Sequence, residues 1–302
     1  SPTRIYVLAA DNGVVSEGVS SAPQSVTRAQ AINLTRGLTG ASCLAKHFHD
    51  GLTVVDMGIA LPYTCPEILD RSLGKGTANI AAGPAMPRPA AVQGILTGME
   101  LAAQARQDGI RLLGVGEMGI GNTTTSSAVL CALSGEFVEA VTGRGGGLTD
   151  AAFCRKKQVI EQALAVNRPI DVLCKVGGFD LCAMTGVFLG AAHARLPVVV
   201  DGFISIVAAL CAARLCENTR GFFFGSHVSY ERGYKVAEQL LGLQPCLQLG
   251  MRLGEGSGCP LAFRVIEAAC AVISTMATFP EAAIEDDYLT PIRAQDSFTV
   301  TP

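Results

Sequence analysis

Five short apolar runs recur along the chain, and each closes on a polar or glycine-rich turn. They are "IYVLAAD" (5–11), "LTVVDMG" (52–58), "RLLGVGE" (111–117), "LPVVVDG" (196–202) and "GFFFGSH" (221–227). Continuous apolar runs of this length are typical of strands that are buried on both faces. Helix-like stretches separate the runs, at 25–48, 88–109, 123–134, 154–167 and 205–216. Strand alternating with helix predicts βαβ units, and therefore an α/β fold around a mostly parallel sheet.

After residue 240 the pattern becomes helical, with 258–279 as the clearest helix, and the tail 281–302 is polar without a strong period. The chain has 302 residues, of which 49% are hydrophobic and 16% are charged. This length and composition suit one large domain or two modest ones around a large core.

Charge and hydropathy exclude two classes of partner. The net charge is −3 and no run of Lys or Arg occurs, so we expect no nucleic-acid partner. The apolar run 196–215 is interrupted by Asp201, and such a charge is costly in a bilayer, so we expect no membrane span. No signal peptide opens the sequence, and we expect a cytoplasmic protein.

The eleven cysteines are scattered, and none forms a CxxC pair. Several lie inside apolar runs such as "AALCAARLC", which favours buried thiols in a reducing cytosol over a disulfide framework. The four histidines do not pair with cysteines at ligand spacing, so we expect neither a metal site nor a cofactor.

Polar residues end the five predicted strands, namely Asp11, Asp56, Glu117, Asp201 and Ser226. In an open parallel sheet the ligand lies beyond the carboxyl ends of the strands. One aspartate in such a place usually caps the next helix. Five polar strand ends at one edge favour a ligand site.

Glycine-rich segments lie among these strand ends. "GVGEMGIGNTT" contains G-x-G-x-x-G at 114–119, a weak match to a dinucleotide fingerprint, and no Walker lysine follows it. Its Asn122–Thr125 cluster could cap a helix and donate to a phosphate at the helix N-terminus. "GRGGGLTD" (143–150) is followed by Lys156 and Lys157, "KVGGFD" spans 175–180, and "RLGEGSGCP" (252–260) places Glu255 between two glycines. Taken alone, Glu255 resembles an acid in a surface turn.

Seven segments in this order resemble the nicotinate-nucleotide–dimethylbenzimidazole phosphoribosyltransferase family. They are "AADNGVVSEGVS", "GKGTANIAAGPAM", "GVGEMGIGNTTT", "VGGFDLCAMTGVFLGAA", "LPVVVDGFISIVAAL", "GSHVSYERG" and "MRLGEGSGCPLAF", and they cover nearly the whole chain. The resemblance implies transfer of phosphoribosyl from nicotinate mononucleotide to an aromatic base in cobamide assembly. It also implies a homodimer with a Rossmann-like, doubly wound domain and a smaller helical domain. We expect the first over 1–245, with 246–302 contributing to the second and to the active site. The family's N-terminal helices have no counterpart in this sequence.

The resemblance also implies roles for single residues. Glu255 matches the proposed catalytic base, whose pKa an apolar site should raise, and Glu117 matches a second carboxylate near the ribose and the departing nicotinate. A negative charge there would stabilise a transition state of oxocarbenium character. We expect nucleotide and phosphate contacts from Gly119, Asn122, Thr123, Lys156, Asp201, Gly202 and Ser229. We expect the aromatic-base pocket at Gln30, Ala22, Met118 and Leu253.

The sequence departs from the family at two positions. Asn12 stands where the family usually has histidine in "DHG", and Ala22 stands where well-known members have serine. Both positions bear on the choice of acceptor. Transfer to phenol or p-cresol, by the catalytic subunit of a heterodimer with a homologous chain, is therefore an alternative.

A Rossmann oxidoreductase and a non-catalytic partner subunit are further alternatives. The oxidoreductase is disfavoured because the glycine motif follows the third predicted strand rather than the first. The partner subunit is disfavoured because Glu117 and Glu255 are both present.

Overall fold

The computed structural model describes residues 2–168, 171–285 and 287–294. The chain divides into two compact units, Ser1–Phe263 and Arg264–Pro302. The second unit holds most of helix α11 (Cys259–Thr275), the short helix η3 (Asp287–Leu289) and α12 (Thr290–Arg293). The first unit contains the sheet and is the unit that carries the candidate site.

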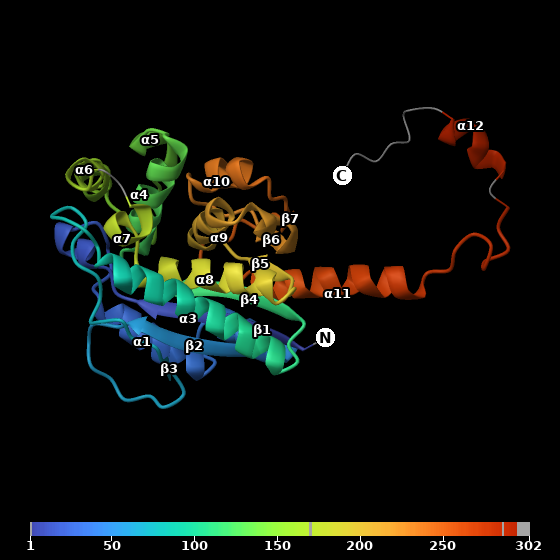
Figure 1. The fold of residues 1–302 in the computed structure, drawn as a ribbon, viewed down its shortest axis with the longest axis horizontal. Coiled ribbons are helices and arrows are strands. Elements are labelled where there is room, and N and C mark those ends of the chain that lie inside the picture. The colour runs from blue at the N-terminus through green and yellow to red at the C-terminus, as the bar shows by residue number, and fades with distance from the viewer. Residues whose placement is uncertain (1, 169–170, 286, 295–302) are drawn as a thin grey trace. The chain divides into compact units, whose positions relative to one another are not determined.

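Seven strands form one sheet in the order β3-β2-β1-β4-β5-β6-β7 (Figure 1). Every neighbouring pair is parallel. The bounds are β1 (Thr3–Ala10), β2 (Gly51–Gly58), β3 (Leu69–Asp70), β4 (Leu112–Met118), β5 (Val198–Val200), β6 (Phe223–His227) and β7 (Pro245–Leu247). This is a doubly wound α/β fold, and the order reverses direction between β1 and β4. Ligands bind beyond the carboxyl ends of the strands at such a reversal.

All five predicted strands are present, because their side chains are buried almost without interruption. In β1, for example, every residue from Ile5 to Ala10 is buried. The two edge strands β3 and β7 were not predicted. The sequence pattern after residue 240 indicated helix, and this was wrong for 245–247, where three partly exposed residues pair with β6.

The helices of the first unit lie on both faces of the sheet (Figure 1). Helices α1 and α2 pack against β2, whereas α8 packs against β1, β2 and β4, and α3 packs on α8. The helices are α1 (Ser25–Thr35), α2 (Gly40–Phe48), α3 (Arg88–Gln107), α4 (Asn122–Ser134), α5 (Val138–Val141), α6 (Asp150–Val166), α7 (Val172–Val176), α8 (Phe179–His193), α9 (Phe203–Leu215) and α10 (Tyr234–Leu241), with short helices η1 (Gly13–Glu17) and η2 (Glu217–Phe222).

The predicted helical stretch 25–48 is two helices rather than one. Gly37 takes a φ of 73°, which ends α1, and Thr39 then caps α2 in a capping box with Ser42. This break directs the N-terminus of α2 toward the candidate site described below. Helix α8 was not among the predicted helices. Its residues are apolar on all sides and leave no helical period, as in α9, which was predicted because it directly follows an apolar strand run.

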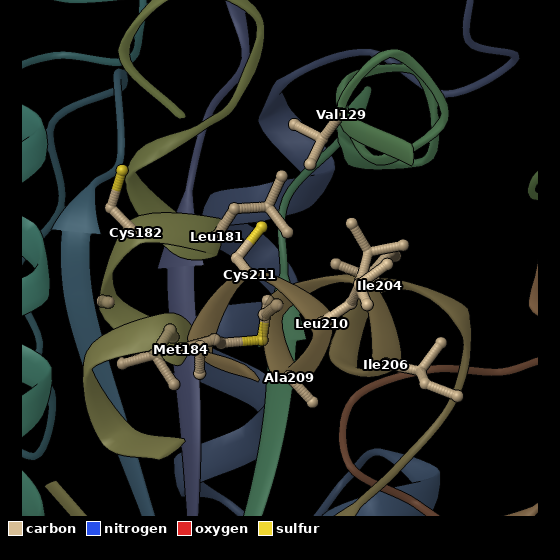
Figure 2. Packing of buried hydrophobic residues seen from close by; sticks show 14 of the residues in the cluster. Val129, Leu181, Cys182, Met184, Ile204, Ile206, Ala209, Leu210 and Cys211 are labelled. Atoms are coloured by element: carbon tan, nitrogen blue, oxygen red, sulfur yellow. The ribbon is translucent and has the colours of Figure 1, made fainter. Parts of the chain in front are cut away.

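The core lies where α8 and α9 pack together on the sheet. Figure 2 shows Leu181 and Met184 of α8 beside Leu210 and Cys211 of α9. The contact between α3 and α8 is closer still. A Cβ built on Gly98 would lie 2.0 Å from the Ala183 carbonyl oxygen, and one on Gly186 would lie 2.0 Å from that of Ile95. These two helices can therefore pack backbone to backbone only because both positions are glycine.

All eleven cysteines are free. Buried thiols were predicted, and Cys131, Cys174, Cys182, Cys211 and Cys259 are buried, whereas Cys43, Cys154, Cys216, Cys246 and Cys270 are exposed. Over the described residues, no helix is long and apolar enough to span a membrane.

Candidate active site

A pocket of about 190 Å³ opens at the carboxyl edge of the sheet, and we call it the central pocket. It is bounded by the end of β4, the start of α4, the 145–146 loop, the start of α9, the segment after β6 and residues 252–254. Most of the residues predicted for the site line it, namely Glu117, Met118, Gly119, Asn122, Thr123, Asp201, Gly202, Ser229 and Leu253. Residues far apart in sequence thus meet where a parallel sheet is expected to bind its ligand.

Glu117 lies near the end of β4 and is 7% exposed. Asn122 Nδ2 donates a hydrogen bond to Oε2 of this carboxylate, and the backbone N–H of Glu255 approaches Oε1 at 3.5 Å. Burial, together with the negative charges of Asp180 and Asp201, raises the pKa of Glu117 to about 8. The surroundings therefore favour a neutral Glu117 at pH 7, and a cation bound beside it would favour the carboxylate.

Lys156 of α6 lies beside the Thr123 end of the pocket; it is fully buried and is not among the residues that line the pocket. Its Nζ donates to Thr123 Oγ1 at 2.9 Å and to the Gly143 carbonyl at 3.0 Å. Burial lowers the pKa of Lys156 to about 8, and the charge of Glu231 opposes this shift. Two of the three ammonium donors are used within the described part of the chain, so one is left for an anion.

The N-terminus of α4 lies at the same end of the pocket as Lys156. Gly121 precedes the helix with a φ of 92°, and Thr123 lies in its first turn. The N–H groups of such a first turn attract anions. Gly119 lies in the preceding turn, where a Cβ would come within 2.3 Å of the Ala10 carbonyl oxygen, so only glycine fits there.

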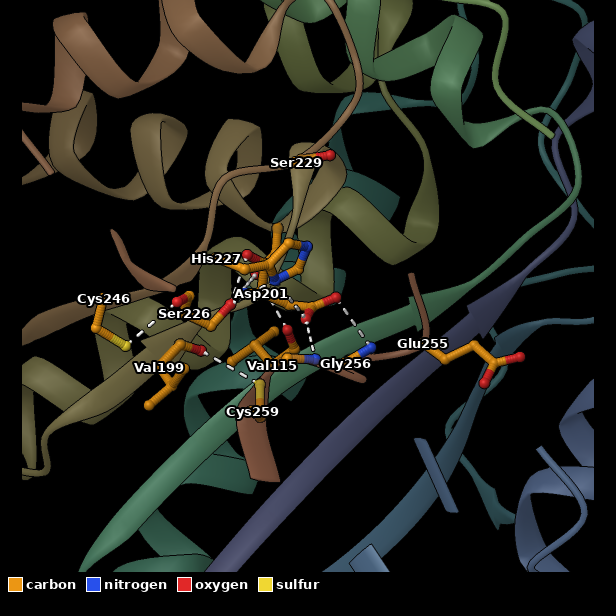
Figure 3. A network of polar contacts seen from close by, with 12 residues as sticks. Val115, Val199, Asp201, Ser226, His227, Ser229, Cys246, Glu255, Gly256 and Cys259 are labelled. Atoms are coloured by element: carbon orange, nitrogen blue, oxygen red, sulfur yellow. Dashed lines mark hydrogen bonds and ion pairs between the residues drawn. The ribbon is translucent and has the colours of Figure 1, made fainter. Parts of the chain in front are cut away.

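Asp201 follows β5 and holds the segment 254–258 by its carboxylate. Oδ1 accepts from the Gly258 N–H at 2.7 Å and Oδ2 accepts from the Gly256 N–H at 3.2 Å (Figure 3). Burial raises the pKa of Asp201 to about 7, against these backbone donors. Asp201 lines the pocket, and its hydrogen bonds also fix the segment that carries Glu255. Gly202 follows it and is the N-cap residue of α9.

Glu255 is 2% exposed and has a φ of 63° between Gly254 at 81° and Gly256 at 78°. A left-handed backbone at glutamate costs on the order of 1 kcal/mol. Figure 3 shows its carboxylate pointing away from Asp201. There Oε1 accepts from Gln30 Nε2 at 3.4 Å, and Oε2 accepts from the Ala41 N–H at 3.3 Å, in the first turn of α2. The surface-turn interpretation of Glu255 is therefore wrong.

The four residues predicted for the aromatic-base pocket do not all line one pocket. Gln30 of α1 bonds Glu255, as just described. Met118 and Leu253 line the central pocket, although Leu253 is 56% exposed and lies against Gly40 at the start of α2. Ala22 lies in the loop before α1, where its N–H donates to Ser20 Oγ, and it is not part of the lining of the central pocket.

The G-x-G-x-x-G match at 114–119 has a structural explanation that differs from dinucleotide binding. Gly114 and Gly116 lie inside β4 rather than in a turn. A Cβ on Gly116 would come within 2.5 Å of the Glu255 carbonyl, and one on Gly114 would lie 2.7 Å from the Cys259 Cβ. These glycines let the segment 254–259 lie directly on the strand.

Sequence reasoning missed several residues of the site, although each lay inside a segment that it had singled out. Asp180, from "KVGGFD", is buried beside Glu117, and burial raises its pKa to about 6. The central pocket is also lined by Gly145, Gly146, His227, Glu231 and Arg252. The glycine loop and the motifs around these residues were visible, but which of their side chains point inward depends on the fold.

The site as a whole combines buried carboxylates near β4 with an ammonium group and a helix N-terminus at its other end. Among the described residues, no group of three or more His, Cys, Asp or Glu is arranged to hold a metal ion. The arrangement suits a ligand with a cationic and an anionic part, held beside Glu255, which can accept a proton.

Comparisons with known proteins agree with this arrangement. A phosphoribosyltransferase family model matches residues 1–284. A nicotinate-nucleotide–dimethylbenzimidazole phosphoribosyltransferase of Clostridium perfringens is 48% identical over 301 residues, which cover 98% of this chain and 83% of the relative. A protein of the same name from Ruminiclostridium cellulolyticum is 47% identical over 287 residues, covering 93% and 82%.

The crystal structure of CobT from Thermus thermophilus is similar to this one with a TM-score of 0.91 and 40% sequence identity, over 94% of this chain and 87% of CobT. Identity and fold thus agree along nearly the whole length of the chain. The chain belongs to the nicotinate-nucleotide–dimethylbenzimidazole phosphoribosyltransferase family.

Proposed function

We propose that this enzyme moves the 5-phosphoribosyl group of nicotinate mononucleotide to an aromatic base such as dimethylbenzimidazole, releasing nicotinate. The product is an α-linked ribotide for cobamide assembly. The observation that carries the proposal is that two buried acidic residues far apart in sequence are brought together: the backbone N–H of Glu255 lies 3.5 Å from Glu117 Oε1, and the Glu255 carboxylate is held by Gln30 and the Ala41 N–H. The names of the relatives favour this transfer over a Rossmann oxidoreductase, a non-catalytic subunit or a phenol-specific enzyme.

The donor fits the two ends of the central pocket. Its phosphate would bind at the Lys156 end, on the free ammonium donor, the start of α4 and Ser229. Its nicotinate ring carries a positive charge on the glycosidic nitrogen, which suits the Glu117 end. This assigns nucleotide and phosphate contacts to Gly119, Asn122, Thr123, Lys156, Asp201, Gly202 and Ser229.

The acceptor would lie between Glu255 and the donor, beside Gln30, Met118 and Leu253. A ring nitrogen attacks C1 of the ribose, the bond to nicotinate breaks, and its electron pair neutralises the nicotinate nitrogen. The second ring nitrogen of the base gives its proton to Glu255, whose carboxylate is oriented by Gln30 and the Ala41 N–H. Glu117 stabilises the positive charge that develops at the ribose.

The proposal extends to the assembly of the enzyme. Residues 1–245 would form the catalytic domain, and 246–302 would contribute to a small helical domain and to the site, in a homodimer or with a homologous subunit. Supporting this, α11 exposes large apolar side chains, among them Val272 at 52% and Ile273 at 83%. Eleven free thiols suit the reducing cytoplasm.

The test is base-dependent release of nicotinate. Purified protein is incubated with nicotinate mononucleotide alone and then with dimethylbenzimidazole, adenine, phenol or p-cresol. We expect nicotinate and an α-ribotide only when an acceptor is present, as measured by chromatography and by the anomeric proton in NMR spectra. Release without an acceptor would indicate a hydrolase, and no release with any acceptor would rule out the transfer.

A further inference from the structure

His227, at the end of β6, is a buried group that the mechanism above does not use. Its Nδ1 lies 2.9 Å from Ser226 Oγ and 3.8 Å from Asp201 Oδ1. A Cβ built on Gly258 would collide with all three of these atoms, at 2.4 to 2.8 Å. The backbone of the 254–258 segment thus closes over the Nδ1 side of the ring, and Figure 3 shows Asp201 and Ser226 beside it.

The hydrogen bonds of Ser226 decide which ring nitrogen carries the proton. The Ser226 hydroxyl lies 2.9 Å from the Asp201 carbonyl oxygen, which can only accept, so the single hydroxyl proton is directed there. Ser226 Oγ must then accept from His227, and Nδ1 carries the proton. Burial lowers the pKa of His227 to about 4, so the ring is neutral at pH 7 and the 3.8 Å approach to Asp201 is not an ion pair.

The other ring nitrogen, Nε2, therefore has a free lone pair. Within the described part of the chain, the side chain of His227 forms its one hydrogen bond through Nδ1. A Cβ on Gly202 would lie 3.6 Å from Nε2 and 3.7 Å from Ser229 Oγ, so both atoms face the space above Gly202. His227, Gly202 and Ser229 all line the central pocket.

We propose that His227 is a substrate-positioning residue, held in the Nδ1–H form by Ser226 so that Nε2 accepts a hydrogen bond from a ribose hydroxyl of the donor. The inference rests on the proposed function for the identity of the donor, and the form of the ring is independent of it. A lone pair at Nε2 repels a phosphate oxygen and attracts a hydroxyl. The Nε2 lone pair therefore selects a ribose hydroxyl at its own position, while the neighbouring Ser229 hydroxyl can still donate to the phosphate.

The form of the ring can be measured directly. The chain contains four histidines, so selective ¹⁵N labelling gives a simple two-bond ¹H–¹⁵N spectrum, and His227→Asn identifies the His227 signals. At pH 7 we expect Nδ1 at the shift of a protonated nitrogen and Nε2 at that of an unprotonated one. Nicotinate mononucleotide should move the Nε2 signal. A ring protonated at Nε2 in the wild type would overturn the proposal.

Kinetics with deoxy donors test the contact itself. In the wild type, removing the hydroxyl that His227 binds should lower kcat/KM by about tenfold, the size of one hydrogen bond, in either the 2′-deoxy or the 3′-deoxy analogue. His227→Asn keeps an N–H group in place of Nδ1–H but removes Nε2. It should lower kcat/KM for nicotinate mononucleotide by a similar factor. The deoxy analogue that lost activity with the wild type should then react with this variant as well as nicotinate mononucleotide does. His47→Asn, on the exposed side of α2, is the matched control.

Ser226→Ala provides a second variant that leaves His227 in place. Without the acceptor for Nδ1–H, we expect a larger share of the Nε2–H form in the NMR spectrum and a weaker deoxy penalty. Deoxy penalties equal in wild type and His227→Asn would refute the contact. A wild-type enzyme without base-dependent nicotinate release would instead refute the proposed function, while the NMR measurement of the ring would still stand or fall on its own.

Discussion

The two ends of the central pocket differ in sign, yet each holds one buried ionisable group that the protein pushes toward its neutral form. Burial raises the pKa of Glu117 to about 8 and lowers that of Lys156 to about 8. At the Glu117 end, the charges of Asp180 and Asp201 act in the same direction as burial, whereas at the Lys156 end Glu231 opposes it. The pocket is thus prepared for a ligand that brings a positive and a negative charge of its own.

In the proposed mechanism, the Lys156 end of the pocket binds the phosphate and the Glu117 end stabilises positive charge. Glu255 accepts the proton. The largest loss should therefore come from Glu255→Gln, which we expect to lower kcat by about a hundredfold or more while leaving donor affinity unchanged. Gln has one oxygen, which can accept from the Ala41 N–H or from Gln30 but not from both as the carboxylate does, and it cannot take the proton. Fixed-time assays with each acceptor measure kcat, and titration calorimetry with nicotinate mononucleotide measures the donor affinity.

Glu161→Gln, at an exposed position of α6, is the control for loss of a carboxylate. Near-normal turnover of Glu255→Gln with every acceptor would contradict the assignment, and Glu117 would become the base. A more acidic phenol should be affected less than a weakly acidic base, since it needs less help to lose its proton.

Substitution of Lys156 should weaken binding of the donor rather than slow the reaction. Because the phosphate is remote from the reacting bond, Lys156→Ala should raise KM for nicotinate mononucleotide by about tenfold or more and change kcat by less than about threefold. Lys156→Met keeps the buried volume and guards against misfolding. Lys157→Ala is the matched control, since its Nζ lies over the Phe153 ring, 5.1 Å from the centroid. If KM stayed at the wild-type value in both Lys156 variants, the anion site would lie elsewhere.

The shared pKa of about 8 predicts a pH profile with two limbs. As pH rises through about 8, Glu117 loses its proton and becomes the carboxylate that stabilises positive charge. Over the same range Lys156 loses its positive charge and binds phosphate more weakly. The profile of kcat/KM should therefore be a narrow bell centred near pH 8. Glu117→Gln should remove the rising limb and Lys156→Met the falling one.

Asp180→Asn probes the Glu117 end separately. It removes a neighbouring negative charge but can keep an oxygen for the Leu181 N–H, so the rising limb should move to lower pH. A rising limb that survives in Glu117→Gln would belong to another group, and Asp201, whose pKa is about 7, would be the first to examine.

The smallest change is expected outside both ends, at Ala22. An apolar position discriminates weakly between similar acceptors, so the wild type should use several bases and phenols with kcat/KM values within about a thousandfold. Ala22→Ser should shift this preference by only about twofold to threefold, as measured by acceptor competition, with Ala29→Ser on α1 as control. A preference for one base beyond that range in the wild type would contradict a broad acceptor pocket.

The sheet could be predicted from the sequence because strands buried on both faces consist of little but apolar residues, as in β1 and β5. Helix α8 has no helical period because it is buried on every side, and no predicted strand precedes it, whereas the equally buried α9 follows β5 and was predicted from that alternation. Edge strand β7 has only three residues and one of them is proline. Element patterns therefore predicted the centre of the fold better than its edges.

The candidate site was predictable in a different way. Strand ends indicated Glu117 and Asp201 from topology alone, whereas Glu255 was assigned by family resemblance, because its own sequence neighbourhood resembles a surface turn. Asp180 and His227 were missed because their importance depends on partners that only the fold supplies, such as Ser226 Oγ for His227. Gly116 makes room for the backbone of Glu255, and this role can be recognised only when β4 and the 254–258 segment are seen packed together.

The packing of the 254–258 segment on β4 also sets the order in which the protein can fold. Glu117 and Glu255 are 138 residues apart, and the two are joined only when the end of the first unit has been synthesised. A ribosome-bound chain can complete β1, β2, β4 and β5 without the 254–258 segment, so it can form the sheet before it has a working site. In refolding, the slow closure of so long a loop should make recovery of activity lag behind recovery of helical circular dichroism.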